Sequence, residues 1–454
     1  MKKLVGAIRS RLNGADSRTK SINKNISVSL ALKPVTLVLY FLLIKVSLDI
    51  LGNQYFGVWT TIFTFVGSIA FLDVGLGSGL RNKLVHAIFE KDYLKARAYV
   101  STAYCSMIIL VAGIVLLFLP FLYFADLAGF FKISQTLSLE VKLSVFVCVL
   151  GVGLVLVLKL LNILFYSHQN TFYPDLIWIA SQAAVLCLLL LCRNIIEGSL
   201  IRFALIYAVT PVLIYTSLSM VFFRKRFLRL KPSITLFRKE YIKDIMTLGL
   251  KFFVIQISGI VLYSIDNVLI TYLFDSNAVT DYNIPFRYFN ILVMAFSTIL
   301  LPYWSMTTNA VASGDTEWIK KAVKRLMLLW GAVAVGGIVM LFCSPIAYNI
   351  LAGDGVKVDL SLSVVILVFC LAMNWAGIFN TITYGMGLIT AQMWLSVIGI
   401  FVNVTLSIVL VKYFNAGLIA IPLSYAFYAV IVSGLVFLQL KRGLQSQLLK
   451  NNIQ

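Results

Sequence analysis

Basic side chains in or beside long apolar stretches are the residues of this sequence best placed to do chemistry. Two of them, Lys142 and Arg202, lie within a turn of the end of a stretch, so their side chains can extend to the interface. A charge at the centre of a lipid bilayer costs at least about 2.5–3.5 kcal/mol and normally faces a protein interior or a wet cavity. The others therefore predict a cationic interior that binds an anion: Lys33, Lys45, Lys159, Lys251 and Arg287. For Lys33, Lys159 and Lys251, extension toward the cytoplasmic headgroups is an equal alternative.

Asp266 and Arg287 should lie at a similar depth, because they occupy consecutive stretches that a short loop makes antiparallel. One interpretation is an ion pair between them. The other is that Arg287 binds an anionic substrate while Asp266 holds it in position or takes up a proton. Lys45 and Asp49 are four residues apart, and this spacing favours a pair that neutralises itself.

Asp73 begins a glycine-rich run, Asp73-Val-Gly-Leu-Gly-Ser-Gly-Leu-Arg-Asn82, at the end of an apolar stretch. No strand precedes it, so the glycines are weak support for a phosphate-binding loop. Small residues allow helices to approach closely, and this packing interpretation is favoured. The alternative is a flexible helix end that opens and closes a gate.

The elements that must hold these residues are membrane-spanning helices. The chain has 454 residues, of which 60% are hydrophobic and 12% charged, whereas about 25% of the residues are charged in a soluble domain. About 20 apolar residues span a bilayer. Twelve stretches of this kind predict an all-α polytopic membrane protein: 26–49, 55–76, 99–123, 140–165, 172–192, 200–223, 247–272, 282–304, 326–350, 360–383, 388–411 and 416–438.

The connecting segments alternate in charge. Of the 38 lysines and arginines, 27 lie in the segments 1–25, 81–97, 224–246, 306–325 and 439–454. Positive residues stay on the cytoplasmic side, so both termini are expected there. The net charge of +20 is explained by this distribution and not by binding to nucleic acid.

The largest basic loop divides the twelve predicted spans into two sets of six. We therefore expect a cytoplasmic basic segment at 1–25, an amino-terminal lobe at 26–223, the loop at 224–246, a carboxy-terminal lobe at 247–438 and a cytoplasmic tail at 439–454. Transporters are often built from such repeated halves, here around a central cationic cavity. The first dozen residues could form a helix lying on anionic lipids of the inner leaflet, or a disordered basic tail.

Enzyme motifs are largely lacking from the sequence. There is no serine–histidine arrangement, no cluster of paired carboxylates and no nucleotide-binding loop. The six cysteines lie in apolar stretches without a metal-ligand spacing, and only two histidines are present. We expect neither catalysis nor a cofactor or metal ion.

Several stretches resemble the bacterial flippases that export lipid-linked O-antigen oligosaccharides, the Wzx type of the MOP transporter superfamily. The likeness is carried by Gly52-Asn-Gln-Tyr-Phe-Gly-Val-Trp59, by the run from Asp73 to Asn82 with the following Lys95-Ala-Arg-Ala-Tyr-Val-Ser-Thr102, and by Lys24-Asn-Ile-Ser27. In the second half, Ser264-Ile-Asp-Asn267 and Tyr282-Asn-Ile-Pro-Phe-Arg287 are similar to the family's seventh and eighth spans.

The resemblance implies a two-lobed bundle in the bacterial inner membrane. It would move an undecaprenyl-pyrophosphate-linked sugar repeat from the inner to the outer leaflet by alternating access, coupled to H⁺ or Na⁺. The five interior bases, Arg287 and Lys251 first, would bind the substrate, and Asp266 and Asp73 would couple the ion or gate the path. An O-antigen polymerase and a chain-length regulator are the protein partners that this function implies.

Two other functions remain open from the sequence. A cation-coupled drug exporter of the same superfamily would need carboxylates or aromatic side chains for cationic drugs, whereas bases outnumber acids in the apolar stretches. A membrane-embedded glycosyltransferase or O-antigen polymerase would need a substantial external loop or domain, whereas the longest external loop predicted here has about 15 residues.

Overall fold

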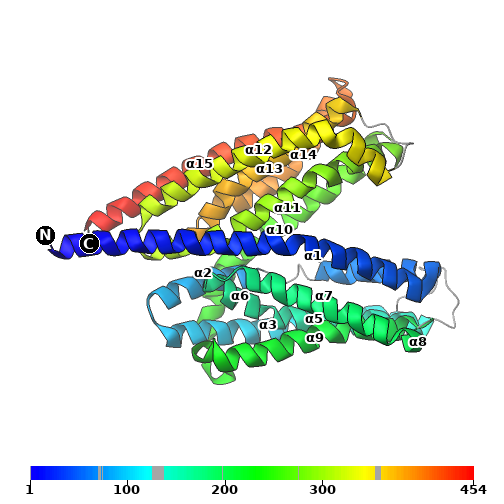
Figure 1. Ribbon diagram of the computed structural model, residues 1–454, viewed down its shortest axis with the longest axis horizontal. Coiled ribbons are helices and arrows are strands. Elements are labelled where there is room, and N and C mark those ends of the chain that lie inside the picture. The colour runs from blue at the N-terminus through cyan, green and yellow to red at the C-terminus, as the bar shows by residue number, and fades with distance from the viewer. Residues whose placement is uncertain are drawn as a thin grey trace. The chain divides into compact units, whose positions relative to one another are not determined.

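Helices form all the regular secondary structure in the part of the chain described by this computed structural model (Figure 1). The described residues are 2–69, 73, 75–124, 138–196, 198–274, 276–352 and 359–453. The all-α membrane class predicted from the apolar stretches is confirmed. Long apolar segments become helices in a bilayer because a helix satisfies every backbone hydrogen bond internally.

Eleven described helical segments are long and apolar enough to span a membrane, and each coincides with one predicted span. They are Ile22–Gly52, Tyr93–Phe124, Ser138–Ser167, Phe172–Leu191, Leu200–Lys225, Lys239–Leu262, Asp281–Ala312, Thr316–Tyr348, Leu360–Gly385, Thr390–Lys412 and Gly417–Gln445. The twelfth, predicted at 55–76, is helical as far as Ile69. Residues 70–72 and 74 lie outside the described residues.

The first helix, α1 (Lys2–Ile69), covers both the basic amino-terminal segment and the first two predicted spans. It contains a kink at Gly52, whose φ of 66° and ψ of 171° are accessible almost only to glycine. The backbone therefore changes direction between the two spans at this single residue. The predicted cytoplasmic segment 81–97 is also more regular than expected, because it includes most of α2 (Leu76–Phe89).

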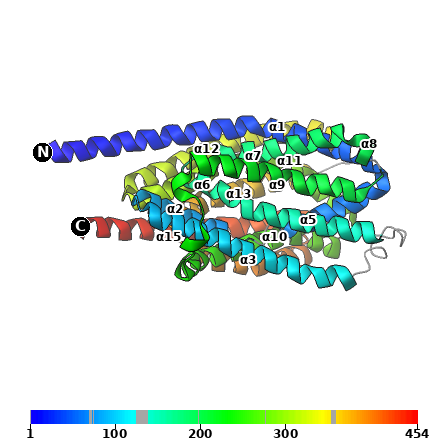
Figure 2. The same ribbon diagram turned by 90° about the horizontal axis from the view of Figure 1, so that it is seen from below.

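The chain divides into two compact units, residues 27–250 and residues 1–26 with 251–454. The remaining helices of the first unit are α3 (Tyr93–Phe124), α5 (Ser138–Leu158), α6 (Leu160–Ser167), α7 (Phe172–Leu191), α8 (Arg193–Ile196) and α9 (Leu200–Lys225). Within this unit, α5 and α9 pack against each other and lie side by side (Figure 2). Gly151 allows this approach, because a Cβ atom there would be 2.6 Å from the Ala208 Cβ.

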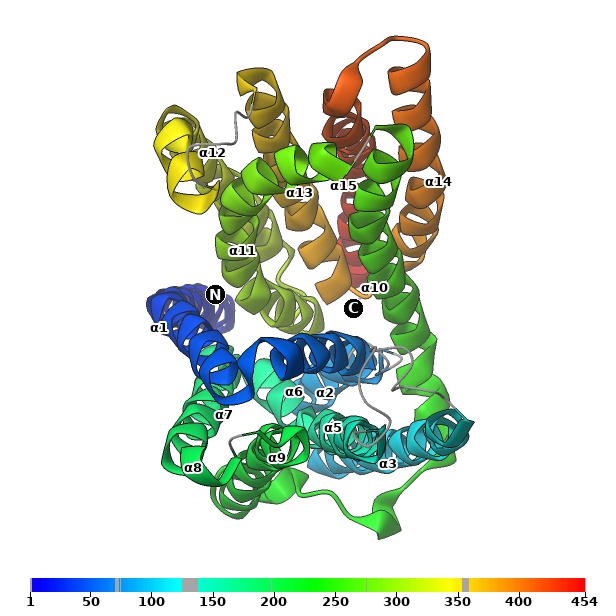
Figure 3. The same ribbon diagram turned by 90° about the vertical axis from the view of Figure 1, so that its right-hand side faces the viewer.

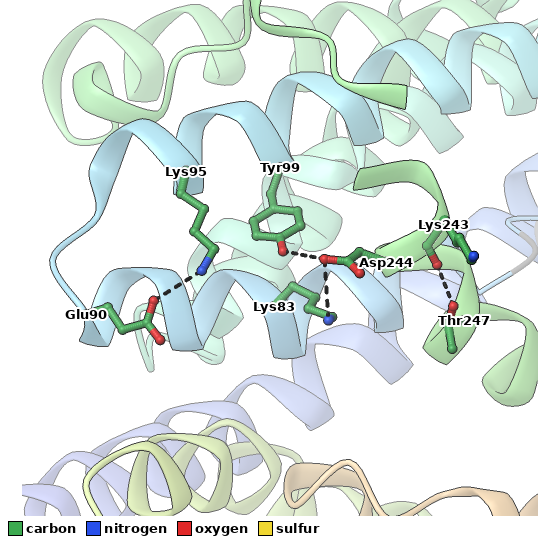
Figure 4. Close-up of polar contacts among 7 residues, drawn as sticks. All are labelled: Lys83, Glu90, Lys95, Tyr99, Lys243, Asp244 and Thr247. Atoms are coloured by element: carbon green, nitrogen blue, oxygen red, sulfur yellow. Dashed lines mark hydrogen bonds and ion pairs between the residues drawn. The ribbon is translucent and has the colours of Figure 1, made fainter. Parts of the chain in front are cut away.

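Helix α10 (Lys239–Leu273) begins in the first unit, after short 3₁₀ turns at Leu228–Leu230 and Ile234–Leu236. Asp244 fastens it to α2 and α3 (Figure 4). The Tyr99 hydroxyl donates to the Asp244 Oδ2 at 2.8 Å, and the Lys83 Nζ lies 3.7 Å from the same atom. The Tyr99 and Tyr241 rings stack at 4.4 Å beside this contact. The predicted loop 224–246 therefore ends in an anchored helix.

The second unit contains α11 (Ser276–Ala312), α12 (Thr316–Ala352), α13 (Leu360–Gly385), α14 (Thr390–Lys412) and α15 (Ala420–Ile453). Helix α13 packs against α11, α12 and α15, and α11 and α13 are seen side by side along their axes in Figure 3. The beginning of α1 belongs to this unit. Ile22 is only 1% exposed in its core, and the Arg325 Nη2 donates to the Asn23 Oδ1 at 2.7 Å.

Candidate functional site

A buried carboxylate lies at the centre of a polar cluster in the second unit. Asp266 on α10 is 4% exposed. Its Oδ2 accepts a hydrogen bond from the Tyr282 hydroxyl at 3.0 Å, and its Oδ1 accepts one from the Asn403 Nδ2 at 3.3 Å. Burial of an ionised carboxylate is costly unless hydrogen bonds or a counter-charge compensate it. These two donors from α11 and α14 supply part of that compensation.

The cluster continues from Asn403 into α15. The Ser424 hydroxyl donates to the Asn403 Oδ1 at 2.6 Å, and the Ser407 hydroxyl lies 2.6 Å from that of Ser424. Asn403, Ser407 and Ser424 are each 0% exposed. We call these three residues with Asp266 and Tyr282 the Asp266 cluster. It gathers a carboxylate, an amide and hydroxyl groups, which are oxygen ligands for a hard cation or partners for a proton.

The ion pair considered between Asp266 and Arg287 is not formed in the described structure, so that interpretation was wrong. Arg287 on α11 is exposed, while Asp266 is buried with Tyr282. Arg287 follows Tyr282 by five residues, which at 3.6 residues per turn places the two side chains about 140° apart around the helix. Asp266 and Arg287 were predicted at a similar depth in the membrane, but Arg287 lies on a different face of α11 from Tyr282, the residue that contacts Asp266.

Lys159 lies at a break between α5 and α6, where it is half-buried. Its side chain lines a cavity of about 210 Å³ within the first unit, which we call the Lys159 cavity. Among the described residues, Lys159 is the only charged one lining this cavity, and none of them forms an ion pair with it within 4 Å. The helix break thus presents an ammonium group to a mostly apolar space.

Aromatic side chains from three helices line the Lys159 cavity. Trp59 and Phe63 come from α1, Trp178 from α7 and Tyr207 from α9. The Trp59 ring centroid is 4.8 Å from that of Tyr207, and Phe63 packs against both. Ser181 on α7 also lines the cavity; it is 1% exposed, and its hydroxyl has no hydrogen-bond partner in the described part of the chain.

Asp73 lies on an adjoining cavity of about 190 Å³, which Lys159 also lines. The Asp73 Oδ1 accepts a hydrogen bond from the Gly75 backbone N–H at 2.9 Å, which holds the carboxylate at its own turn. A Cβ atom at Gly75 would lie 1.9 Å from the Gly249 carbonyl oxygen, and one at Gly79 would lie 2.3 Å from that of Ile245. The glycine-rich run therefore packs α2 closely against α10, in agreement with the favoured interpretation.

The other predicted bases are not among the residues of the Asp266 cluster or those that line the Lys159 cavity. Lys251 is half-buried, and its Nζ donates to the Thr390 Oγ1 at 2.6 Å. Lys33 is half-buried on α1, whereas Lys45 is exposed. Asp49 is also exposed, and no ion pair within 4 Å joins it to Lys45 in the described structure, contrary to the favoured prediction. An exposed pair at this spacing gains only about 0.3–0.5 kcal/mol, too little to hold two mobile side chains together.

A buried base of α2 was overlooked because it falls in a predicted cytoplasmic segment. Arg81 is 3% exposed, and its guanidinium lies over the Tyr166 ring, 4.8 Å from the centroid. Burial lowers the pKa of Arg81 to about 10, so the group stays protonated near neutral pH. Burial also lowers the pKa of His86 on the same helix. The basic residues around Arg81 indicated a cytoplasmic segment and so gave no sign that this side chain is buried.

Other functional candidates were missed because they are uncharged. Asn403 and Ser407 stand inside the apolar stretch of α14, and an amide in such a position is a recognisable signal for a buried polar contact. The tryptophans and tyrosine of the Lys159 cavity gave no such signal, because aromatic residues are common throughout the spans and at both membrane interfaces.

Residues 22–308, more than half of the chain, match the family of polysaccharide biosynthesis proteins. No curated protein matches the sequence significantly.

The fold is similar to those of solved transporters, although the sequences are distant. An outward-facing multidrug resistance MATE family transporter of the MOP superfamily is 17% identical with a TM-score of 0.77, over 95% of this chain and 96% of that one. The Vibrio cholerae MATE transporter VcmN in its bent form is 13% identical with a TM-score of 0.78, over 96% and 99%. A Pyrococcus furiosus transporter of the MOP superfamily, whose binding pocket is described as of reverse polarity, is 15% identical with a TM-score of 0.74, over 95% and 96%.

Proposed function

This chain belongs to the polysaccharide biosynthesis protein family, and on that basis we propose that it is a flippase for a lipid-linked oligosaccharide. The substrate is an undecaprenyl-pyrophosphate-linked repeat unit of O-antigen or a related polysaccharide. It moves from the inner to the outer leaflet of the bacterial inner membrane by alternating access. The all-helical fold with eleven described candidate spans supports a membrane transporter.

The observation that carries the proposal is the uncompensated charge of Lys159 on a mostly apolar cavity within a membrane-spanning unit. An ammonium group in such a place attracts an anionic substrate and repels a cationic one. A pyrophosphate with attached sugars cannot cross hydrocarbon unaided, and charge-assisted hydrogen bonds lower the cost of removing its water. Arg287, Lys251, Lys45 and Lys33 are the further bases proposed to contact the substrate along its path.

Ion coupling is proposed at Asp266, because a buried carboxylate with amide and hydroxyl neighbours can bind H⁺ or Na⁺ reversibly. Binding of the ion would remove the uncompensated charge of the carboxylate and so favour one state of the transport cycle. Asp73 is proposed as a gating residue, since its carboxylate caps the turn that begins α2.

The test is export of the repeat unit in bacteria that lack this protein. We expect lipid-linked repeat units to accumulate on the inner leaflet, where a membrane-impermeant oxidant modifies them in inverted vesicles and not in intact spheroplasts. The wild-type gene should restore export, while Asp266→Asn should insert at the wild-type level and fail to restore it. Asp49→Asn, which alters an exposed carboxylate, is the matched control and should restore export.

Arg287 can be tested in the same strain. Arg287→Ala should abolish rescue while the protein still inserts, and Arg202→Ala is the matched control, because Arg202 donates to the Ile195 carbonyl at 2.7 Å near a helix end. Full rescue by Arg287→Ala would remove this arginine from the mechanism. Repeat units that never accumulate in the deletion strain would refute the flippase function itself.

The alternatives predict different phenotypes. A drug exporter would leave the repeat units unaffected and make the deletion strain sensitive to organic cations. A glycosyltransferase or polymerase would extend a sugar chain when the purified protein receives lipid-linked repeat units. Either outcome without inner-leaflet accumulation would replace the flippase proposal.

The inner membrane location with both termini in the cytoplasm is part of the same proposal. It rests on the basic segments of the sequence. A reporter that is active only in the cytoplasm should be active when it is fused to either end of the chain. A reporter that is active only outside the cytoplasm should be inactive at both ends. Contacts with inner-leaflet anionic lipids and with an O-antigen polymerase and chain-length regulator are proposed with this topology.

A further inference from the structure

The features of the Lys159 cavity together indicate a particular kind of anionic ligand. It has one ammonium group, an aromatic wall and a buried hydroxyl, that of Ser181, without a partner among the described residues. Ligand sites in proteins are typically apolar concavities with a few polar groups that fix orientation. Polar groups of this kind here include Lys159, Ser181 and Gln182, which all line the same space.

The Lys159 cavity has a volume of about 210 Å³, which is on the scale of a single six-membered sugar ring. The neighbouring carboxylate, Asp73, is held by the Gly75 N–H and makes no ion pair with Lys159 in the described structure.

The residues that line the Lys159 cavity do not suit an organic cation, a neutral sugar or a bare phosphate. An organic cation would be repelled by Lys159, and a neutral sugar would leave the ammonium group without a counter-charge. A bare phosphate would use the charge but would gain nothing from Trp59, Trp178 and Tyr207. A sugar ring with a carboxylate satisfies all three features, because its C–H face can cover an aromatic ring while hydroxyls meet Ser181.

We infer that the Lys159 cavity is a binding site for one acidic sugar residue, a hexuronic acid, of the transported repeat unit. The carboxylate of the sugar pairs with Lys159, a ring hydroxyl bonds to the Ser181 Oγ, and the apolar face of the ring lies against the aromatic wall. The sugar assignment rests on the proposed function. It gives the flippase a preference for repeats that contain an acidic sugar.

The test uses the purified full-length protein in detergent micelles and ligand-observed saturation-transfer NMR, which detects weak contacts. Methyl glucuronide is the probe, with methyl glucoside and inorganic phosphate as competitors. We expect saturable contact with the glucuronide that neither competitor displaces at equal concentration. Lys159→Met should weaken it by about tenfold or more, since a charge-assisted hydrogen bond is lost. Lys142→Met, which changes a base of α5 bonded to the Tyr123 carbonyl, is the matched control and should bind normally.

A second variant keeps the test decisive if Lys159→Met does not fold. Ser181→Ala removes one oxygen and keeps the shape of the side chain, so it should fold normally and weaken the contact several-fold. Equal competition by phosphate would mean a general anion site and overturn the inference, as would normal binding in Lys159→Met and Ser181→Ala. Failure of binding in a protein that still exports repeat units would refute the cavity assignment alone. Binding in a protein whose loss causes no accumulation would refute the flippase function alone.

Discussion

Gly75 offers the sharpest test of how the amino-terminal unit is assembled. Its φ of +72° lies in the left-handed region, and a Cβ atom there would lie 1.9 Å from the Gly249 carbonyl oxygen of α10. Gly75→Ala therefore adds two separate costs. The left-handed conformation costs an alanine about 1–2 kcal/mol, and the steric overlap adds the roughly 1–3 kcal/mol typical of overpacking.

The expected loss of stability is the sum of these two costs, less a gain in backbone entropy. Alanine loses less backbone entropy on folding than glycine, which returns about 0.5–1 kcal/mol. We therefore expect Gly75→Ala to destabilise the unit by about 1–4.5 kcal/mol, the sum of the two costs less the returned entropy. At roughly 2–4 °C per kcal/mol for a unit of this size, the melting temperature should fall by roughly 2–18 °C.

Two other glycines separate these contributions. Gly387 has a φ of +73°, and no described atom lies within 4 Å of the place that a Cβ atom would take, so Gly387→Ala tests the conformational cost alone. Gly57 is helical and equally unobstructed, so Gly57→Ala should be neutral or stabilising by about 0.5–1 kcal/mol. The measurement is thermal unfolding of the purified proteins in detergent. If Gly75→Ala melts no lower than Gly387→Ala, the close approach of α2 to α10 is refuted.

Three further predictions concern other buried polar groups. Arg81→Met and Tyr166→Leu should be coupled by about 2 kcal/mol in a double-mutant cycle of unfolding, because the cation lies over the ring away from water; additive effects would contradict this. Asn403→Leu should cost about 1–3 kcal/mol in the same assay, since it removes a donor from the buried Asp266 carboxylate, and wild-type stability would argue against the cluster. The pKa of His86 is lowered by burial, so the unfolded state binds the proton first and stability should fall as pH drops below about 6.5; His86→Gln should lose less stability over that range than the wild type, and an identical pH profile would exclude the effect.

The helical class and nearly all span positions could be predicted from the sequence. Each span depends on the summed hydropathy of about 20 neighbouring residues, so a few polar side chains do not change the outcome. Asp266, inside the seventh stretch, is an example: the helix forms around it regardless of its charge. The sequence predicted no regular structure for the basic connecting segment 81–97, whereas α2 continues into it as far as Phe89.

The partners of the polar residues could not be predicted in the same way. Asp266 meets Asn403 across 137 positions of sequence, and neither residue carries a charge pattern that indicates the other. Arg287 was paired with Asp266 on depth alone, but rotation about the helix axis turns it away. Lys159 was identified as an interior base, while the aromatic wall around it depends on how three other helices pack.

The sequence by itself determined that the chain forms long apolar helices and which few of them carry charges, because these properties are local sums over neighbouring residues. Only the tertiary structure decided which side chains face one another. That outcome depends on helix rotation and on close approaches such as Gly75 against Gly249, where the absence of a side chain sets the distance between two backbones.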